Sequence, residues 1–293
     1  PYLKFITQFG SIKYYNLYST FINPDMVDVG RKKHSTIHYL HYDLTKNINI
    51  GIFESILWQS KSEGVYKGFE LAYLNPVIFY RPVEFSQHSN KGNALMGATF
   101  SVNYKDMTIY SQFLLDDLNL SRQKDSDESY SLGFFQNKFG YQIGFKGKIN
   151  SLNFLFEFNQ VQPYTYAHKT VLQNYTHMNQ AIAHPYGANF KELISIFSLN
   201  KNKLSYKLKS KYTQIGLDSI NTHYGQNIFM SDFDASTGGQ YSYGNYNGQG
   251  VKTHVFSIET EISYNLDWFE IYGNLYFKSQ TSHLFEEDVI LYT

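Results

Sequence analysis

Long stretches in which every second residue is apolar constrain this chain more than any other feature. Between residues 256 and 266, and again between 269 and 278, aromatic and aliphatic residues alternate with Ser, Glu, Asn and Lys. A period of two residues indicates a β-strand with one apolar and one polar face. Strands of soluble proteins are mostly about five or six residues long, whereas about ten tilted residues cross a bilayer. The pattern therefore favours a transmembrane β-barrel over a soluble β-sandwich.

Twelve stretches follow this pattern, some of them less regularly. They are 3–9, 12–22, 35–44, 48–57, 94–104, 107–116, 138–147, 152–159, 190–199, 204–212, 256–266 and 269–278. Their polar faces carry Asn, Gln, Lys, Glu and Ser, which suits a wet lumen, and aromatic residues gather near strand ends, as at a membrane interface. We therefore predict an all-β, antiparallel outer-membrane β-barrel, with residues 1–293 as one domain that is incomplete at both ends.

The connections between these stretches differ in length. Short turns at 104–106 and 265–267 contrast with long segments such as 170–187 and 216–250. Short turns at one end and long extracellular loops at the other are typical of outer-membrane barrels. Proline-containing breaks in the alternation predict an inward-folded segment or a short helix at about 66–92, and a second inward, plug-like segment is expected at 163–189. The Gly-, Tyr- and Asn-rich segment 216–250 is expected to be a flexible loop.

Composition narrows the function classes. The mean hydropathy is −0.39, and apolar runs of about five residues are far shorter than a transmembrane helix requires. Zero net charge argues against a nucleic-acid partner, and the absence of cysteine excludes disulfides and thiolate chemistry. We expect a protein of the bacterial outer membrane whose first partner is lipid.

Two segments, 73–85 and 163–189, hold most of the unusual polar chemistry. In the first, Arg81 and Glu84 lie among aromatic residues, where they form either an ion pair that fixes an inward loop, the preferred interpretation, or one wall of a ligand site. In the second, His168, His177 and His184 have spacings of nine and seven residues, which match no compact zinc pattern. Loop-anchoring hydrogen bonds are therefore preferred for these histidines, and we expect no metal and no cofactor.

Aromatic rings can stack on sugar rings, while amides and guanidinium groups bind sugar hydroxyls. The candidate ligand-binding residues in the lumen and loops are Asn75, Tyr80, Arg81, Glu84, Tyr164, Tyr166, His168, His177, Asn179, Gln180, His184 and Asn189. No catalytic residue is expected. A lipid hydrolase in the barrel wall is kept as an alternative, although no serine lies in a Gly-flanked nucleophile motif.

Four segments also carry a resemblance: YLNPVIFYRPVEF (73–85), NALMGATFSVNY (93–104), PYTYAH (163–168) and NYTHMNQAIAHPYGANFKE (174–192). They resemble outer-membrane proteins related to the gliding-motility protein RemB, within the broader capsule-assembly Wzi-like barrel family. The resemblance spans about residues 50–230 and implies a non-enzymatic barrel that attaches surface polysaccharide or supports motility-associated adhesion. An accessory barrel in a multiprotein secretion or motility complex, with protein partners, is the alternative.

Overall fold

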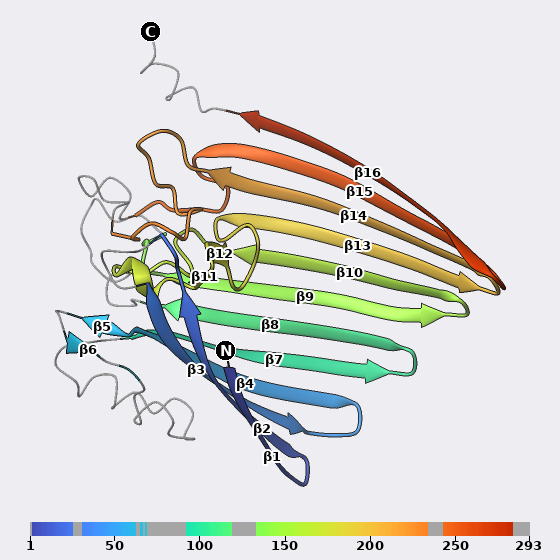
Figure 1. Ribbon diagram of the computed structural model, residues 1–293, viewed down its shortest axis with the longest axis horizontal. Helices are drawn as coiled ribbons and strands as arrows, with labels where there is room; N and C mark the ends of the chain where they lie inside the picture. Colours follow the sequence, from blue (N-terminus) through green and yellow to red (C-terminus); the bar gives the residue numbers. More distant parts are fainter. Residues whose placement is uncertain are drawn as a thin grey trace.

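The computed structural model describes residues 2–25, 31–62, 65–66, 68, 92–118, 133–233 and 243–283. Its main element is one sheet of 12 antiparallel strands that lie side by side in chain order (Figure 1). These strands are β1 (Tyr2–Phe9), β2 (Ile12–Ile22), β3 (Lys32–Asp43), β4 (Ile48–Gln59), β7 (Asn93–Tyr104), β8 (Met107–Asp117), β9 (Lys138–Ile149), β10 (Leu152–Val161), β13 (Phe190–Lys201), β14 (Leu204–Leu217), β15 (Val251–Leu266) and β16 (Phe269–His283).

The predicted all-β, antiparallel fold class is confirmed. Each of the twelve alternating stretches of the sequence corresponds to one strand of the sheet, and every strand pairs with its neighbours along the chain. The remaining elements are short: β5 (Lys61–Ser62), β6 (Val65–Tyr66), a 3₁₀ helix at Val171–Gln173, β11 (Thr176–His177) and β12 (Gln180–Ala181). Within the described ranges, no helix has the length and apolarity needed to span a bilayer.

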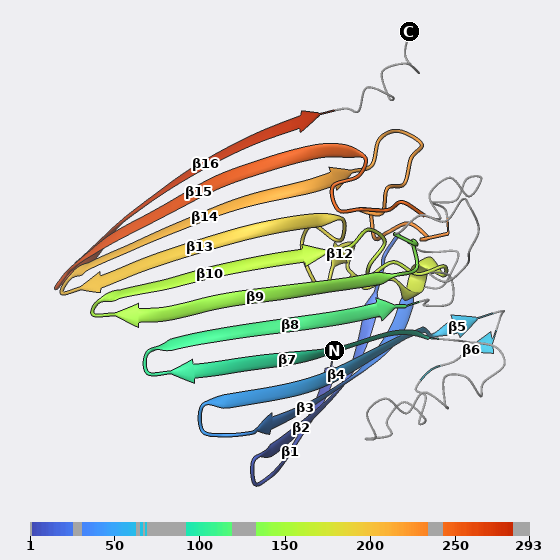
Figure 2. The ribbon, with the colours of Figure 1, turned by 180° about the vertical axis from the view of Figure 1, so that it is seen from behind.

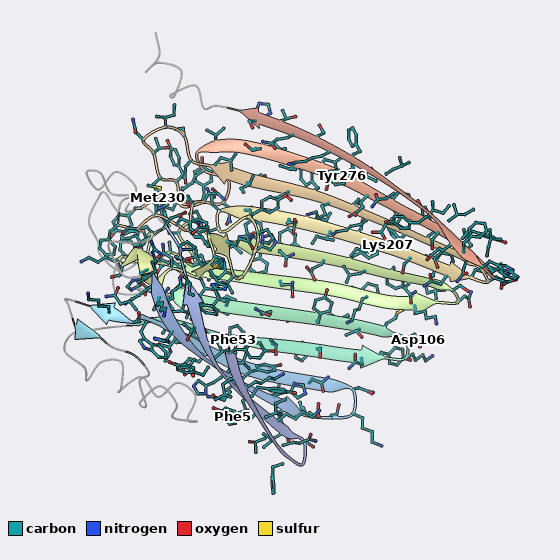
Figure 3. The ribbon with its side chains drawn as sticks, viewed as in Figure 1. Phe5, Phe53, Asp106, Lys207, Met230 and Tyr276 are labelled. Carbon is teal, nitrogen blue, oxygen red and sulfur yellow. The ribbon has the colours of Figure 1, made fainter. Side chains whose placement is uncertain are left out.

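Short turns and long connections lie at opposite ends of the strands, as predicted. Figure 3 places Asp106 at the turn end, whereas Met230 lies among the side chains that gather at the loop end. At the turn end, β7 and β8 are joined by Lys105 and Asp106 alone. Seen from behind, β7 to β16 form a continuous wall with the loops collected at one end (Figure 2).

The loop end holds a compact structure that we call the plug, formed by residues 162–189, 218–233 and 243–250. It packs against the face of the sheet that we call the inner face, and Tyr175 of the plug donates a hydrogen bond to Ser55 of β4 at 2.8 Å. The main buried apolar cluster lies between plug and wall. Its members are Leu57, Leu95, Leu114, Val161, Tyr166, Ala188, Phe190, Ile215 and Ile228.

The segment 216–250 differs from the flexible loop that the sequence led us to expect. His223, Ile228, Asn247 and Gln249 are all buried. Asn247 donates hydrogen bonds to the backbone carbonyls of Val161 and Phe190 at 2.5 and 3.3 Å. The described parts of this segment are therefore structural parts of the plug. The expected inward segment at 66–92 lies, except for its first residue and residues 68 and 92, outside the described residues.

The two faces of the sheet have opposite chemistry. Large apolar side chains of the outer face remain exposed by 37–76%, although most of them lie on interior strands of a 12-stranded sheet. They include Ile50, Ile52, Phe100, Ile109, Phe113, Ile143, Phe156, Leu193, Tyr212, Phe256, Ile262, Leu275 and Phe277. Many are neighbours across strands, as are Ile50 and Phe100, or Tyr212 and Phe256. From β4 to β15 the outer face is therefore a broad apolar surface, whereas on β2 and β3 it carries polar side chains such as Asn16, Thr36 and His38. The inner face carries amides and charges beside the apolar cluster under the plug.

Candidate functional site

A row of polar side chains crosses the inner face below the plug. The strand register aligns Thr99, Gln112, Gln142, Asn159, Glu192 and Thr213 on six consecutive strands, β7 to β14. Gln142 donates to Asn159 at 3.0 Å, and Asn159 donates to Glu157 at 2.9 Å. The inner faces of these six strands therefore share one continuous polar row.

Lysine side chains hold the plug to the wall at two places. Lys33 of β3 is fully buried and donates to the backbone carbonyl of Asn174 and to Thr176 at 3.0 Å. On the opposite side of the plug, Lys138 of β9 donates to the carbonyl of Ala167 at 2.9 Å. Both lysines donate to backbone carbonyls of the plug. Each therefore fixes the path of the plug backbone and not only the position of a side chain.

Several candidate residues hold the plug together or fix it to the wall. Tyr164 is fully buried and donates to the carbonyl of His223 at 2.9 Å. The backbone N–H of Tyr166 donates to Asp116 of β8 at 2.7 Å, and burial raises the pKa of the Tyr166 phenol. Asn189 is fully buried and donates to the carbonyls of Gly216, Tyr224 and Gln249 at 2.9–3.3 Å. The hydrogen bonds of these three residues hold the backbone of the plug in place. The sequence pattern did not indicate this structural role.

The three plug histidines make loop-anchoring hydrogen bonds, as their spacing in the sequence favours. His168 Nδ1 accepts the N–H of Thr170 at 3.0 Å, and burial, reinforced by Lys138, lowers the pKa of His168. His177 Nδ1 accepts the N–H of Ile22 at the end of β2, also at 3.0 Å. His184 Nε2 lies 3.2 Å from Glu192, and its ring stacks on Phe190. In the described part of the chain, no three His, Asp or Glu side chains come together as a metal site would require.

Two candidate residues lie on the exposed hairpin of β11 and β12, Asn179 in its turn and Gln180 at the start of β12. Asn179 donates to Asp25, which ties this turn to the chain that follows β2. Gln180 is exposed, and both residues line a cavity of about 290 Å³ together with Gln226, Asn227 and Phe229. Asn75, Tyr80, Arg81 and Glu84, the candidates of the first polar segment, lie outside the described residues.

A second cavity, of about 240 Å³, lies between the plug and the inner face. The wall contributes Phe53, Gln112, Gln142 and Asn159, and the plug contributes Tyr166, Tyr175 and His184. Tyr166 and His184 were candidates from the sequence, whereas the wall residues were not. Their only signal was their common position on the polar face of adjacent strands, and that alignment requires the strand register.

The outer face of β2 and β3 contains an arrangement that resembles a hydrolase triad. His38 lies between Thr36, at 3.2 Å from Nε2, and Asn16, whose amide donates to Nδ1 at 3.0 Å. Because Nδ1 accepts, Nε2 carries the proton and donates to Thr36, so this histidine cannot remove a proton from the hydroxyl. Thr36 is also fully buried. The geometry therefore does not favour the lipid-hydrolase alternative.

Comparisons with known proteins assign no family. No family model and no curated protein matches the chain. Among solved structures, Pseudomonas aeruginosa OprD has a TM-score of 0.45 and 9% identity over 97% of this chain, which spans 64% of the OprD chain. A double variant of OccD1 (OprD) has a TM-score of 0.42 and 11% identity, covering 97% of this chain and 68% of its own.

Proposed function

We propose that this chain forms the wall and plug of a β-barrel in the bacterial outer membrane. The observation that carries this proposal is the exposed apolar outer face opposite a polar inner face. Contiguous apolar surface of this extent is not left in water by soluble monomeric proteins, but it is required where strands face lipid. The location of long connections at one end and short turns at the other supports the same conclusion.

We further propose that the protein is not an enzyme and that it binds polysaccharide at the cell surface, for capsule attachment or motility-associated adhesion. The relationship to RemB and the Wzi-like barrels is part of this proposal. Its support is chemical: amides and aromatic rings line both cavities around the plug, and these groups suit sugar hydroxyls and sugar ring faces.

Purification of the chain in detergent, followed by two measurements, tests the proposal. Folded outer-membrane barrels resist unfolding by detergent until heated, so the unheated chain should migrate differently from the heated chain on a gel. The folded chain should also be retained on immobilised surface polysaccharide of the producing cells. A chain that stays soluble without detergent and shows no mobility shift would contradict the membrane assignment, and absence of retention would contradict polysaccharide binding.

The two edges of the sheet support a second candidate, an accessory barrel in a multiprotein complex. Within the described residues, β1 pairs only with β2 and β16 only with β15. Every residue of β1 is exposed. An unpaired strand edge can accept a strand from another protein. Stoichiometric co-purification of another outer-membrane protein, lost when Ile6 of β1 is replaced by proline, would favour this candidate.

A further inference from the structure

The cavity between the plug and the inner face has one rigid side and one aromatic side. Gln112, Gln142 and Asn159 form the rigid side, on three consecutive strands. Phe53 lies on the same face, and its ring occupies the space that a Cβ atom on Gly97 would fill. Tyr166 and Tyr175 of the plug line the cavity with their rings 6.0 Å apart. The positions of these groups are therefore set by regular structure and by close packing.

Three polar groups in this cavity have no hydrogen-bond partner among the described residues. Neither the amide of Gln112 nor the hydroxyl of Tyr166 makes a side-chain hydrogen bond, and the Gln142 amide uses its nitrogen but not its oxygen. Tyr166 is buried, Gln142 is half-buried and Gln112 is exposed, so these polar groups are available to a ligand that enters the cavity. Together they provide both donors and acceptors, which is what a ligand with several hydroxyl groups requires.

The charge of the lining restricts the ligand further. Among the described residues that line the cavity there is no Lys, Arg, Asp or Glu, and their one histidine, His184, is engaged by Glu192 at 3.2 Å. A charged ligand would lose its hydration without gaining an opposite charge. A volume of about 240 Å³ is slightly below the range of about 300–1,000 Å³ for drug-sized ligands, so the cavity accepts one small ring and not an extended chain.

We propose that this cavity binds a single uncharged sugar unit in the pyranose form. The amides of Gln112 and Gln142 and the Tyr166 hydroxyl bind its hydroxyl groups, and the ring of Phe53 faces its apolar side. This inference rests on the proposed function, since it places one unit of a surface polysaccharide beneath the plug. It assigns the recognition to wall strands β8 and β9, away from the exposed turn between β11 and β12.

Titration of the detergent-purified chain with free sugars tests the proposal. The probes are glucose, galactose, mannose and N-acetylglucosamine, with glucuronate as the charged counterpart, and binding is followed by saturation-transfer NMR. We expect saturable binding of at least one neutral sugar and weaker or no binding of glucuronate. Gln112→Ala should weaken neutral-sugar binding about five- to tenfold, because it removes the hydrogen bonds of one amide.

Gln280→Ala is the matched control, because Gln280 lies on the inner face of β16, opposite Val255 and away from the cavity. It should bind sugar as the unsubstituted chain does. The heat-dependent gel shift of each variant shows that it is folded. Absence of saturable binding for all four neutral sugars, or equal loss in both variants, would overturn the proposal.

The polysaccharide-retention measurement separates this inference from the proposed function. If Gln112→Ala is retained on polysaccharide as well as the unsubstituted chain, the glycan function stands and the cavity is not its site. If the unsubstituted chain binds neutral sugars but is not retained on polysaccharide, the cavity assignment stands and the proposed function fails.

Discussion

Lys138 of β9 and Asp232 of the plug form a buried ion pair with an N–O distance of 2.5 Å, although 94 residues separate them in the chain. The side chain of each is only 3% exposed. The same ammonium group binds the carbonyl of Ala167. One wall residue therefore connects both main segments of the plug, 162–189 and 218–233, to the barrel wall.

Removal of this ammonium group should destabilise the folded chain. Lys138→Met leaves the carboxylate of Asp232 buried without its partner, which is expected to lower the free energy of unfolding by about 3–5 kcal/mol. Urea unfolding of the chain in lipid vesicles measures the change. Lys138→Met combined with Asp232→Leu should recover only part of the loss, because the unpaired carboxylate of Asp232 is removed while the buried carboxylate of Asp116, which also interacts with Lys138, remains.

The control is Lys203→Met, since Lys203 pairs with Asp267 at 2.7 Å but both are well exposed. Surface pairs contribute about 0–1 kcal/mol. Similar losses for Lys138→Met and Lys203→Met would contradict the role assigned to the buried pair.

Substitution of Asn189 should also destabilise the fold, for a different reason. Its side chain binds three carbonyls and accepts the N–H of Gly248 at 2.7 Å, and its φ of +57° lies in the left-handed region that Asn tolerates better than Ala. Asn189→Ala should therefore lower the free energy of unfolding by about 2–4 kcal/mol. Limited proteolysis should then cut the plug first, whereas Asn200→Ala at the exposed end of β13 should leave the cleavage pattern unchanged.

The packing of the plug around His168 should depend on pH. Burial, with a further contribution from Lys138, lowers the pKa of His168 below its ordinary 6.5, so the folded state favours the neutral ring. The unfolded state then binds more protons between that lowered pKa and 6.5, and stability falls as the pH drops through this window. Above pH 6.5 the contribution is fully present.

Hydrogen exchange of the Thr170 amide, which donates to His168 Nδ1, measures this effect. Its protection should decrease as the pH is lowered from neutral to about 5. His168→Asn retains an acceptor for the N–H two residues later but cannot titrate, so its protection should not change with pH. An unchanged pH response in this variant would mean that another group is responsible.

A glycine on the inner face should tolerate no side chain where an aromatic ring covers it. A Cβ atom on Gly144 would overlap the ring of Tyr110, whose hydroxyl donates to Glu157 at 2.6 Å. Gly144→Ala should therefore lower the free energy of unfolding by about 1–3 kcal/mol. Gly273→Ala is the control, because a Cβ atom there would lie 3.4 Å from Ile262, an ordinary contact. Equal urea-unfolding midpoints for the two variants would contradict the tight packing at Gly144.

The strands were predictable from the sequence because alternation is a local property, and each alternating stretch became one strand. Strand limits were less accurate: β15 begins at Val251, five residues before the predicted start, because it extends along β14 as far as Leu217. The roles of the candidate residues depend on distant partners. His177 binds the backbone of Ile22, 155 residues away, and no local pattern indicates such a contact.

Leu193 and Ile194 are adjacent apolar residues of β13 that face opposite sides of the sheet. Leu193 is 51% exposed on the outer face, between Phe158 and Tyr212. Ile194 lies on the inner face between Glu157 and Lys211. The two positions therefore allow the same kind of substitution to be compared on both faces of one strand.

If the outer face contacts lipid, Leu193→Arg should lower the free energy of unfolding in vesicles by about 2–4 kcal/mol, the cost of arginine near the bilayer midplane. Ile194→Arg should cost less, because its guanidinium group reaches the polar lumen and the carboxylate of Glu157. Urea unfolding in vesicles of matched composition compares the two variants. In detergent micelles, where the outer face is less strictly confined to hydrocarbon, the difference should shrink. If Ile194→Arg is the more damaging change in vesicles, the assignment of the outer face to lipid is wrong.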